Sequence, residues 1–161
     1  MCHDGLVVGV EDLLPRSRTP RDYLDLVADP RIDREGLRAL ASSPYSFVRR
    51  AIAENLQADA ATLAELLTSE PGRWDRNYLL ATIAGHPHAD RAVLLQVLRE
   101  TVSLLNQPNA RPYAAALALA QRSELDAGEV LVLTCQPGAS RRMRRGVRRR
   151  LAARTTNFGA A

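Results

Sequence analysis

The sequence predicts an all-α protein in which pairs of helices are stacked as repeats. Apolar residues make up 46% of the 161 positions but aromatic residues only 4%, and leucine and alanine dominate, which favours closely packed helices over a β-rich core. Apolar residues recur at helical spacing, and segments of the chain share one pattern. The chain is long enough to bury a core without a metal or a disulfide.

The repeated pattern is clearest in "AIAENLQADAATLAELL" (51–67) and "TIAGHPHADRAVLLQVL" (82–98). Each segment has an alanine, Asn or His two residues later and Asp six residues later, with apolar side chains four and seven positions beyond the Asp. The scheme returns in residues 118–134 and, with one residue deleted, in residues 26–41. The sequence therefore predicts about four units, each with a first helix, a tight turn and a second helix.

The first elements in chain order lie ahead of these units. Residues 1–18 hold a short apolar run and are expected to cover the open end of the stack or to extend from it. Thr19 and Pro20 have the chemistry of a helix N-terminus, with Thr19 as the cap and Pro20 in the first turn. In the same way, Ser43 is predicted to cap the first helix of the next unit, with Pro44 at its first position.

Each predicted second helix is preceded by an aspartate. A carboxylate at this position accepts hydrogen bonds from the unpaired N–H groups of the first turn and meets the positive end of the helix dipole. We therefore expect four N-caps, each contributing about 1 kcal/mol relative to alanine. They are Asp33, Asp59, Asp90 and Asp126.

The segment "FVRRAIAENLQADAATLAELL" (47–67) resembles the repeat of the leucine-rich repeat variant family. The matching residues are Val48, Arg49, Ile52, Ala53, Asn55, Leu66 and Leu67. The resemblance implies a right-handed α-solenoid of paired helices, one of each pair short and open to 3₁₀ geometry, related in shape to HEAT-repeat proteins. The later units, 31 and 36 residues from Asp to Asp, approach HEAT length. The founding member of the family has an iron–sulfur cluster on clustered cysteines, whereas only Cys2 lies near this N-terminus.

Positive charge is concentrated at the C-terminal end. All 22 basic residues are arginine, a composition that GC-rich coding explains; residues 1–135 hold 14 of them against 18 acids, and residues 136–161 hold eight with no acid. "VRRRLAAR" (147–154) aligns with "VRRAIAEN" (48–55), so this stretch is predicted to be the first helix of a further repeat. We therefore divide the chain into an extension at 1–18, a repeat domain at 19–138 and a basic capping helix and tail at 139–161.

In that basic helix Met143, Val147 and Leu151 form one apolar stripe. Arg150 and Arg154 lie close to the stripe, so they are expected to snorkel or to pair. The other arginines are expected to face water or a partner and are the predicted binding residues. They are Arg141, Arg142, Arg144, Arg145, Arg148 and Arg149.

Three interpretations of this arginine helix stay open at this point. A terminal repeat needs a polar outer face, but an ordinary cap mixes charges of both signs. The surplus charge instead suits an acidic protein surface, and the lack of a catalytic motif makes a non-enzymatic protein-binding scaffold the first hypothesis. Contact with a nucleic-acid phosphate backbone is the alternative, with weak sequence selectivity because aromatic side chains are scarce nearby.

An enzyme acting on DNA is a remote further alternative. Trp74 and Asp75, between Arg73 and Arg76, are similar to the aromatic-plus-carboxylate sites of HEAT-like alkylpurine DNA glycosylases. Such enzymes need a long basic groove, and the central units here are near-neutral. Trp74 is therefore better explained as a packing residue.

Neither a metal nor a cofactor is expected. The potential zinc ligands match no standard ligand spacing. They are Cys2, His3, His86, His88 and Cys135. Two distant cysteines do not indicate a disulfide framework, and no apolar run reaches the roughly 18 residues of a membrane helix. These features favour a cytoplasmic protein with no membrane contact.

Overall fold

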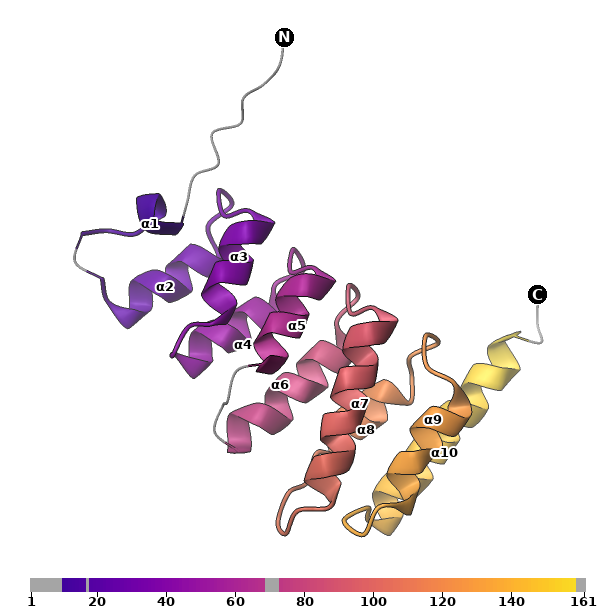
Figure 1. Ribbon diagram of the computed structural model, residues 1–161. Helices are drawn as coiled ribbons and strands as arrows, with labels where there is room; N and C mark the ends of the chain where they lie inside the picture. Colours follow the sequence, from indigo (N-terminus) through magenta and orange to yellow (C-terminus); the bar gives the residue numbers. More distant parts are fainter. Residues whose placement is uncertain (1–9, 17, 69–72, 159–161) are drawn as a thin grey trace. The chain divides into compact units, whose positions relative to one another are not determined.

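The structure is a computed structural model that describes residues 10–16, 18–68 and 73–158 (Figure 1). These residues form helices joined by short loops and no strand, so the predicted all-α class is confirmed. The chain divides into two compact units, Met1–Ser69 and Glu70–Ala161, which are described separately below. The predicted segment boundaries at residues 18 and 138 stay predictions.

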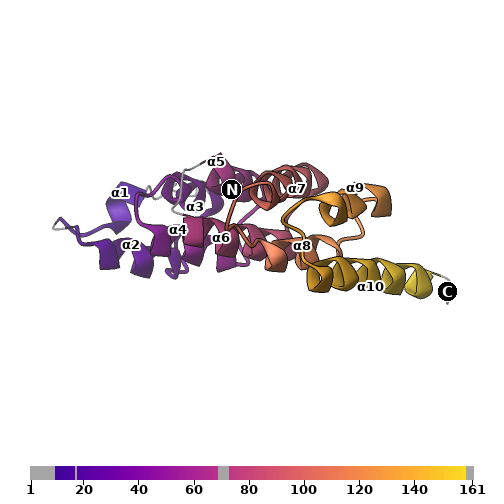
Figure 2. The same ribbon diagram turned by 90° about the horizontal axis from the view of Figure 1, so that it is seen from below.

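The first unit arranges its helices in two layers. Helices α2 and α4 lie against each other in one layer, and α3 and α5 in the other (Figures 1 and 2). Consecutive helices along the chain contact each other across the layers, as a stack of helix pairs requires. The elements are α1 (Val10–Leu13), α2 (Pro20–Val27), α3 (Arg34–Ala41), α4 (Ser46–Glu54) and α5 (Ala60–Thr68).

The second unit repeats this arrangement. Helix α8 lies between α6 and α10 in one layer, and α7 contacts the 3₁₀ helix η1 in the other (Figure 2). The second helices of its two pairs differ in length. Helix α7 is long, whereas α9 is short and continues as η1. The elements are α6 (Arg73–Gly85), α7 (Arg91–Leu105), α8 (Tyr113–Leu119), α9 (Ala127–Leu131), η1 (Val132–Cys135) and α10 (Arg141–Phe158).

The predicted aspartate caps are present in both units. Asp33, Asp59 and Asp90 each accept a hydrogen bond from the backbone N–H three residues later, at 2.8–2.9 Å. Asp126 is the N-cap residue of α9, and its own N–H donates to the carboxylate of Glu129 at 2.8 Å. The recurring aspartates therefore fix where each second helix begins.

The start of α4 was predicted incorrectly. Thr19 caps α2 with Pro20 in the first turn, as expected, but α4 begins at Ser46 rather than at Pro44. The backbone of Tyr45 is extended, which delays the helix, and its ring lies 5.8 Å from that of Tyr23. Ser43 is buried, and its carbonyl accepts a 2.6 Å hydrogen bond from the guanidinium of Arg49.

The Asn or His of the repeat pattern shapes the turn between the paired helices. The side chain of Asn55 accepts from the N–H of Gln57 at 2.8 Å, and Nδ1 of His86 accepts from the N–H of His88 at 3.1 Å. In both cases the side chain accepts a hydrogen bond from the backbone N–H two residues later, as in an Asx turn. The shared position therefore has a local structural role.

At three of these positions, within each unit, the side chain also bonds to the preceding helix pair. Nδ2 of Asn55 donates to the carbonyl of Val27 at 2.9 Å in the first unit. In the second unit Arg122 donates to the carbonyl of Ala89 at 2.9 Å, and Arg154 donates to that of Leu125.

Among the helices that the structure describes, none has both the length and the apolar character that crossing a membrane requires.

Candidate functional site

Helix α10 is held in the second unit by the apolar stripe predicted from its sequence. Met143, Val147 and Leu151 are all buried, and α10 contacts α8, α9 and η1. Gly146 lies close to α8, because a Cβ atom at this position would be 2.7 Å from Cδ2 of Leu117. The side of α10 that faces away from the core is therefore defined by its packing.

Most of the arginines lie on that opposite side, as the sequence predicted. Arg144 differs, since it is only partly exposed and its Nη2 lies 3.4 Å from the carbonyl oxygen of Gln136. It flanks the apolar stripe, one residue after Met143, and its guanidinium reaches the loop that leads into α10. The exposed residues, called the arginine face below, are Arg141, Arg142, Arg145, Arg148 and Arg149.

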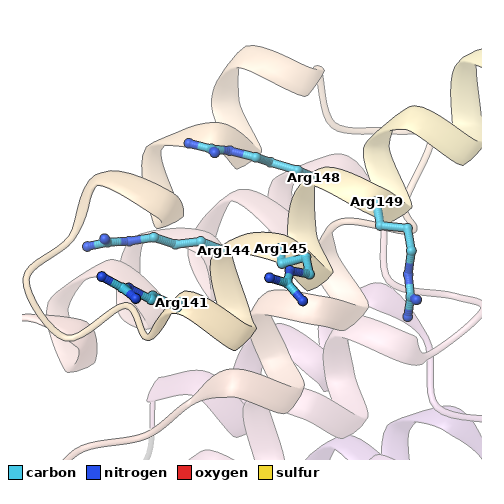
Figure 3. Close-up of a pocket in the computed structure, with 5 residues that line it drawn as sticks. All are labelled: Arg141, Arg144, Arg145, Arg148 and Arg149. Carbon is cyan, nitrogen blue, oxygen red and sulfur yellow. The ribbon is translucent and has the colours of Figure 1, made fainter.

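Arginine side chains also enclose a shallow hollow on this side of α10. Its volume is about 560 Å³, and every residue that lines it is an arginine. The side chains of Arg141, Arg144 and Arg148 extend in one direction, whereas those of Arg145 and Arg149 turn to another side (Figure 3). The hollow therefore presents guanidinium groups from several directions to whatever enters it.

The described acids of the second unit do not neutralise this charge. In the described part of the chain, none of the arginines of α10 forms an ion pair or hydrogen bond with a carboxylate. The acidic residues around α9 already have partners: Glu129 binds Arg91 at 2.8 Å, and Glu124 binds Arg122 at 2.7 Å. Hydrogen bonds from the backbone N–H of Asp126, the larger effect, and from the side chain of Arg91 hold the pKa of Glu129 below its usual 4.5. This carboxylate is therefore charged and engaged near neutral pH.

Comparison with the preceding helix of the same layer shows where the arginine face lies in the stack. Arg148 and Ala152 of α10 stand 32 positions after Ala116 of α8 and Ala120, the C-cap of α8, in the register that also relates Arg154 to Arg122. The two alanines are fully buried, whereas Arg148 and Ala152 are exposed. The arginine face therefore includes a position, that of Arg148, whose counterpart in α8 is buried.

The sequence predicted that these arginines face water or a partner, but not which of them stands at a position that is buried in the earlier first helices. Leu80 of α6 and Ala116 of α8 are buried at the position where α10 has Arg148. In α4 the same position holds Arg49, which is buried and donates to the carbonyl of Ser43.

The described residues among the potential metal ligands do not form a metal site. Within the described ranges no group of three His, Cys, Asp or Glu side chains lies close enough to hold a metal ion. The rings of His86 and His88 are 5.5 Å apart, and Cys135 carries an exposed free thiol. Cys2, His3 and the side chain of Trp74 lie outside what the structure describes.

Arg76, which the comparison with DNA glycosylases placed beside Trp74 and Asp75, is paired within the unit. Its guanidinium bonds to the carboxylate of Glu100 on α7. An arginine held in this way joins α6 to α7 and is not presented to a phosphate.

Comparison of the chain with protein-family models, with curated proteins and with solved structures finds no match.

Proposed function

We propose that this protein is a non-enzymatic scaffold that binds a protein partner with an acidic surface through the arginine face of α10. The proposal includes a stack of about four helix pairs in the form of a right-handed α-solenoid, of the leucine-rich repeat variant or HEAT-like type. Its functional element is the charged end of the second unit rather than a catalytic centre.

The observation that carries the proposal is the single sign of charge at a position where helices stack. Five exposed arginines lie on one side of α10, and the described acids of the second unit do not neutralise them. A partner that covers this side with carboxylates would add to the layer of α6, α8 and α10 as a further helix does. Arginine suits this role because its planar guanidinium binds carboxylates in a bidentate way.

A capping role alone does not account for the charge. Capping requires a polar outer face, and mixed charges meet that requirement at lower cost. On α10, Arg141 and Arg145, and likewise Arg145 and Arg149, stand four residues apart, which places like charges side by side on the helix. Selection for partner binding explains why this repulsion is kept.

A nucleic-acid phosphate backbone is the second candidate, favoured by the hollow lined only with arginines. Phosphates bind guanidinium groups as carboxylates do, and binding of this kind is strongly weakened by salt. About four phosphate contacts would give a slope near −3.6 in a plot of log K against log salt concentration. The protein hypothesis ranks first because aromatic residues on which a base would stack are scarce in the basic segment, where residues 136–161 hold only Phe158.

The test uses an affinity-tagged full-length protein and a variant that carries both Arg145→Glu and Arg149→Glu. The tagged protein should retain an acidic protein at physiological salt, and the double variant should lose it. Arg99 is exposed on α7, so Arg99→Glu is the matched control and should retain the partner. Equal retention by the wild type and the double variant would refute the proposal, and loss of the partner on nuclease treatment would favour the nucleic-acid candidate.

A further inference from the structure

A second cluster of arginine side chains lies on α10 outside the arginine face. Arg150 and Arg154 stand four residues apart at the edge of the buried stripe, and both are partly buried. Together with Gln121 and Ala153 they line a pocket of about 220 Å³. This pocket shares no residue with the arginine-lined hollow described above.

The two guanidinium groups beside the pocket have no carboxylate partner in the described part of the protein. Nη1 of Arg150 lies 3.4 Å from the carbonyl oxygen of Gly146, and Nη2 of Arg154 donates to that of Leu125. Nε of Arg150 and Nη1 of Arg154 are buried and have no hydrogen-bond partner among the described residues. Because burying a charged group without a counter-ion is costly, two such guanidinium groups beside one pocket indicate a missing anion.

The preceding repeat shows which acceptor fits. Arg122, 32 residues before Arg154, also donates to the carbonyl of the residue that precedes a capping aspartate, here Ala89. In addition, Arg122 donates Nε and Nη2 to both carboxylate oxygens of Glu124, at 3.2 and 2.7 Å. Among the described residues Arg154 has no such carboxylate partner, and positions 155–161 of the sequence contain no acid.

We infer that the pocket formed by Gln121, Arg150, Ala153 and Arg154 binds a carboxylate that comes from outside the second unit. The carboxylate takes the role toward Arg154 that Glu124 has toward Arg122, and the guanidinium of Arg150 lines the same pocket. The small Ala153 leaves room for it, and the side-chain amide of Gln121 is a further donor at the rim. This site is independent of the proposed function, because it does not require the arginine face to bind a protein.

The experiment is a titration of the full-length, ¹⁵N-labelled protein with sodium acetate, followed by NMR. The Nε–H resonance of Arg150 reports on the site and is assigned by its absence in Arg150→Gln. Acetate should shift it saturably, whereas sodium chloride at equal ionic strength should not. A shift of the same size with chloride, or no saturation with acetate, would overturn the inference.

Two further arms identify the ligand. A capped triglutamate peptide that binds about tenfold or more tightly than acetate would show that the carboxylate belongs to a polypeptide, and similar affinities would indicate a small free carboxylate. Inorganic phosphate that binds more tightly than both would overturn the assignment to a carboxylate.

The variants separate binding from folding. Arg154→Gln should weaken acetate binding about tenfold, because one of the two charge-assisted donors is lost. If Arg154→Gln unfolds because its bond to Leu125 is missing, Arg150→Gln serves instead, since it keeps that bond. Arg150→Gln should weaken acetate binding similarly, and the amide resonance of Ala153 is then the reporter. Arg99→Gln, on α7, is the matched control and should leave the affinity unchanged; unchanged affinity in both pocket variants would overturn the site.

Discussion

The guanidinium of Arg122 donates to the carbonyl oxygen of Ala89 at 2.9 Å, across the boundary between two successive helix pairs. The same side chain reaches the carbonyl of His86 at 2.8 Å, and it is held by the carboxylate of Glu124. Only 13% of the Arg122 side chain is exposed. One side chain therefore satisfies several backbone acceptors that end the preceding helix and begin the next.

Replacing Arg122 by methionine should destabilise the second unit. The change removes the arginine donor from the carbonyls of Ala89 and His86 and the charged partner from Glu124, so we expect the free energy of unfolding to fall by about 2–3 kcal/mol. The single tryptophan, Trp74, lies in α6, so its fluorescence in a urea titration reports on the second unit. Arg99→Met removes an exposed arginine and should change stability by less than about 0.5 kcal/mol; equal midpoints for the two variants would contradict the account.

Removing the cap of α7 should have a smaller effect. Asp90→Ala leaves the N–H of Val93 without its 2.9 Å acceptor and should cost about 1 kcal/mol of unfolding free energy, whereas Asp90→Asn keeps an acceptor and should cost much less. Urea unfolding of the two variants, followed by the same fluorescence, checks this. Similar losses in both would mean that the capping bond does not stabilise the helix.

Acid should selectively remove the contribution of Asp59. Hydrogen bonds from the backbone N–H and then the hydroxyl of Thr62 lower the pKa of Asp59 from 3.8 in the folded protein. A lowered folded-state pKa means that the stabilisation is fully present above the unfolded value of 3.8 and is lost as the pH falls through the folded value. Below about pH 4 the free energy of unfolding of the wild type should therefore fall relative to that of Asp59→Asn. Urea unfolding of both proteins, followed by circular dichroism, measures this difference. A difference that does not change with pH would contradict this assignment.

Arg145→Glu should separate stability from binding. The glutamate would stand four residues from Arg141 and Arg149 and replace two like-charge pairs with opposite-charge pairs, each worth about 0.2–0.5 kcal/mol. We therefore expect a more stable protein at low salt and weaker binding of the partner. The gain should disappear at high salt, and a stable variant that binds normally would show that Arg145 is not part of the docking surface.

The sequence predicted the elements whose signals are local. The aspartate before each second helix and the spacing of Met143, Val147 and Leu151 act within a few residues, and the structure confirms them. The start of α4 was missed because the extended backbone of Tyr45, whose ring contacts Tyr23 on α2, outweighs the local preference of Ser43 and Pro44.

The candidate sites depended on information that sequence patterns lack. Arg144 was expected at the surface with its neighbours, but its burial depends on the loop around Gln136, which is not part of the helical pattern. The pairing of Glu124 and Glu129 with arginines of other segments, and the unpaired donors of Arg150 and Arg154, depend on which side chains the fold brings together. Single-sign charge in α10 was evident from the sequence, whereas the engagement of the described acids of the second unit with other arginines was not.

Site-specific photo-crosslinking tests the central claim most directly. A photoreactive amino acid is introduced at position 149, on the arginine face, or at position 99 on α7, and the full-length protein is irradiated in the cells that produce it. The account predicts that position 149 crosslinks to a discrete protein with an acidic surface, that position 99 does not, and that adding Arg145→Glu abolishes the product. Equal crosslinking at both positions, or products at position 149 that contain only nucleic acid, would contradict it.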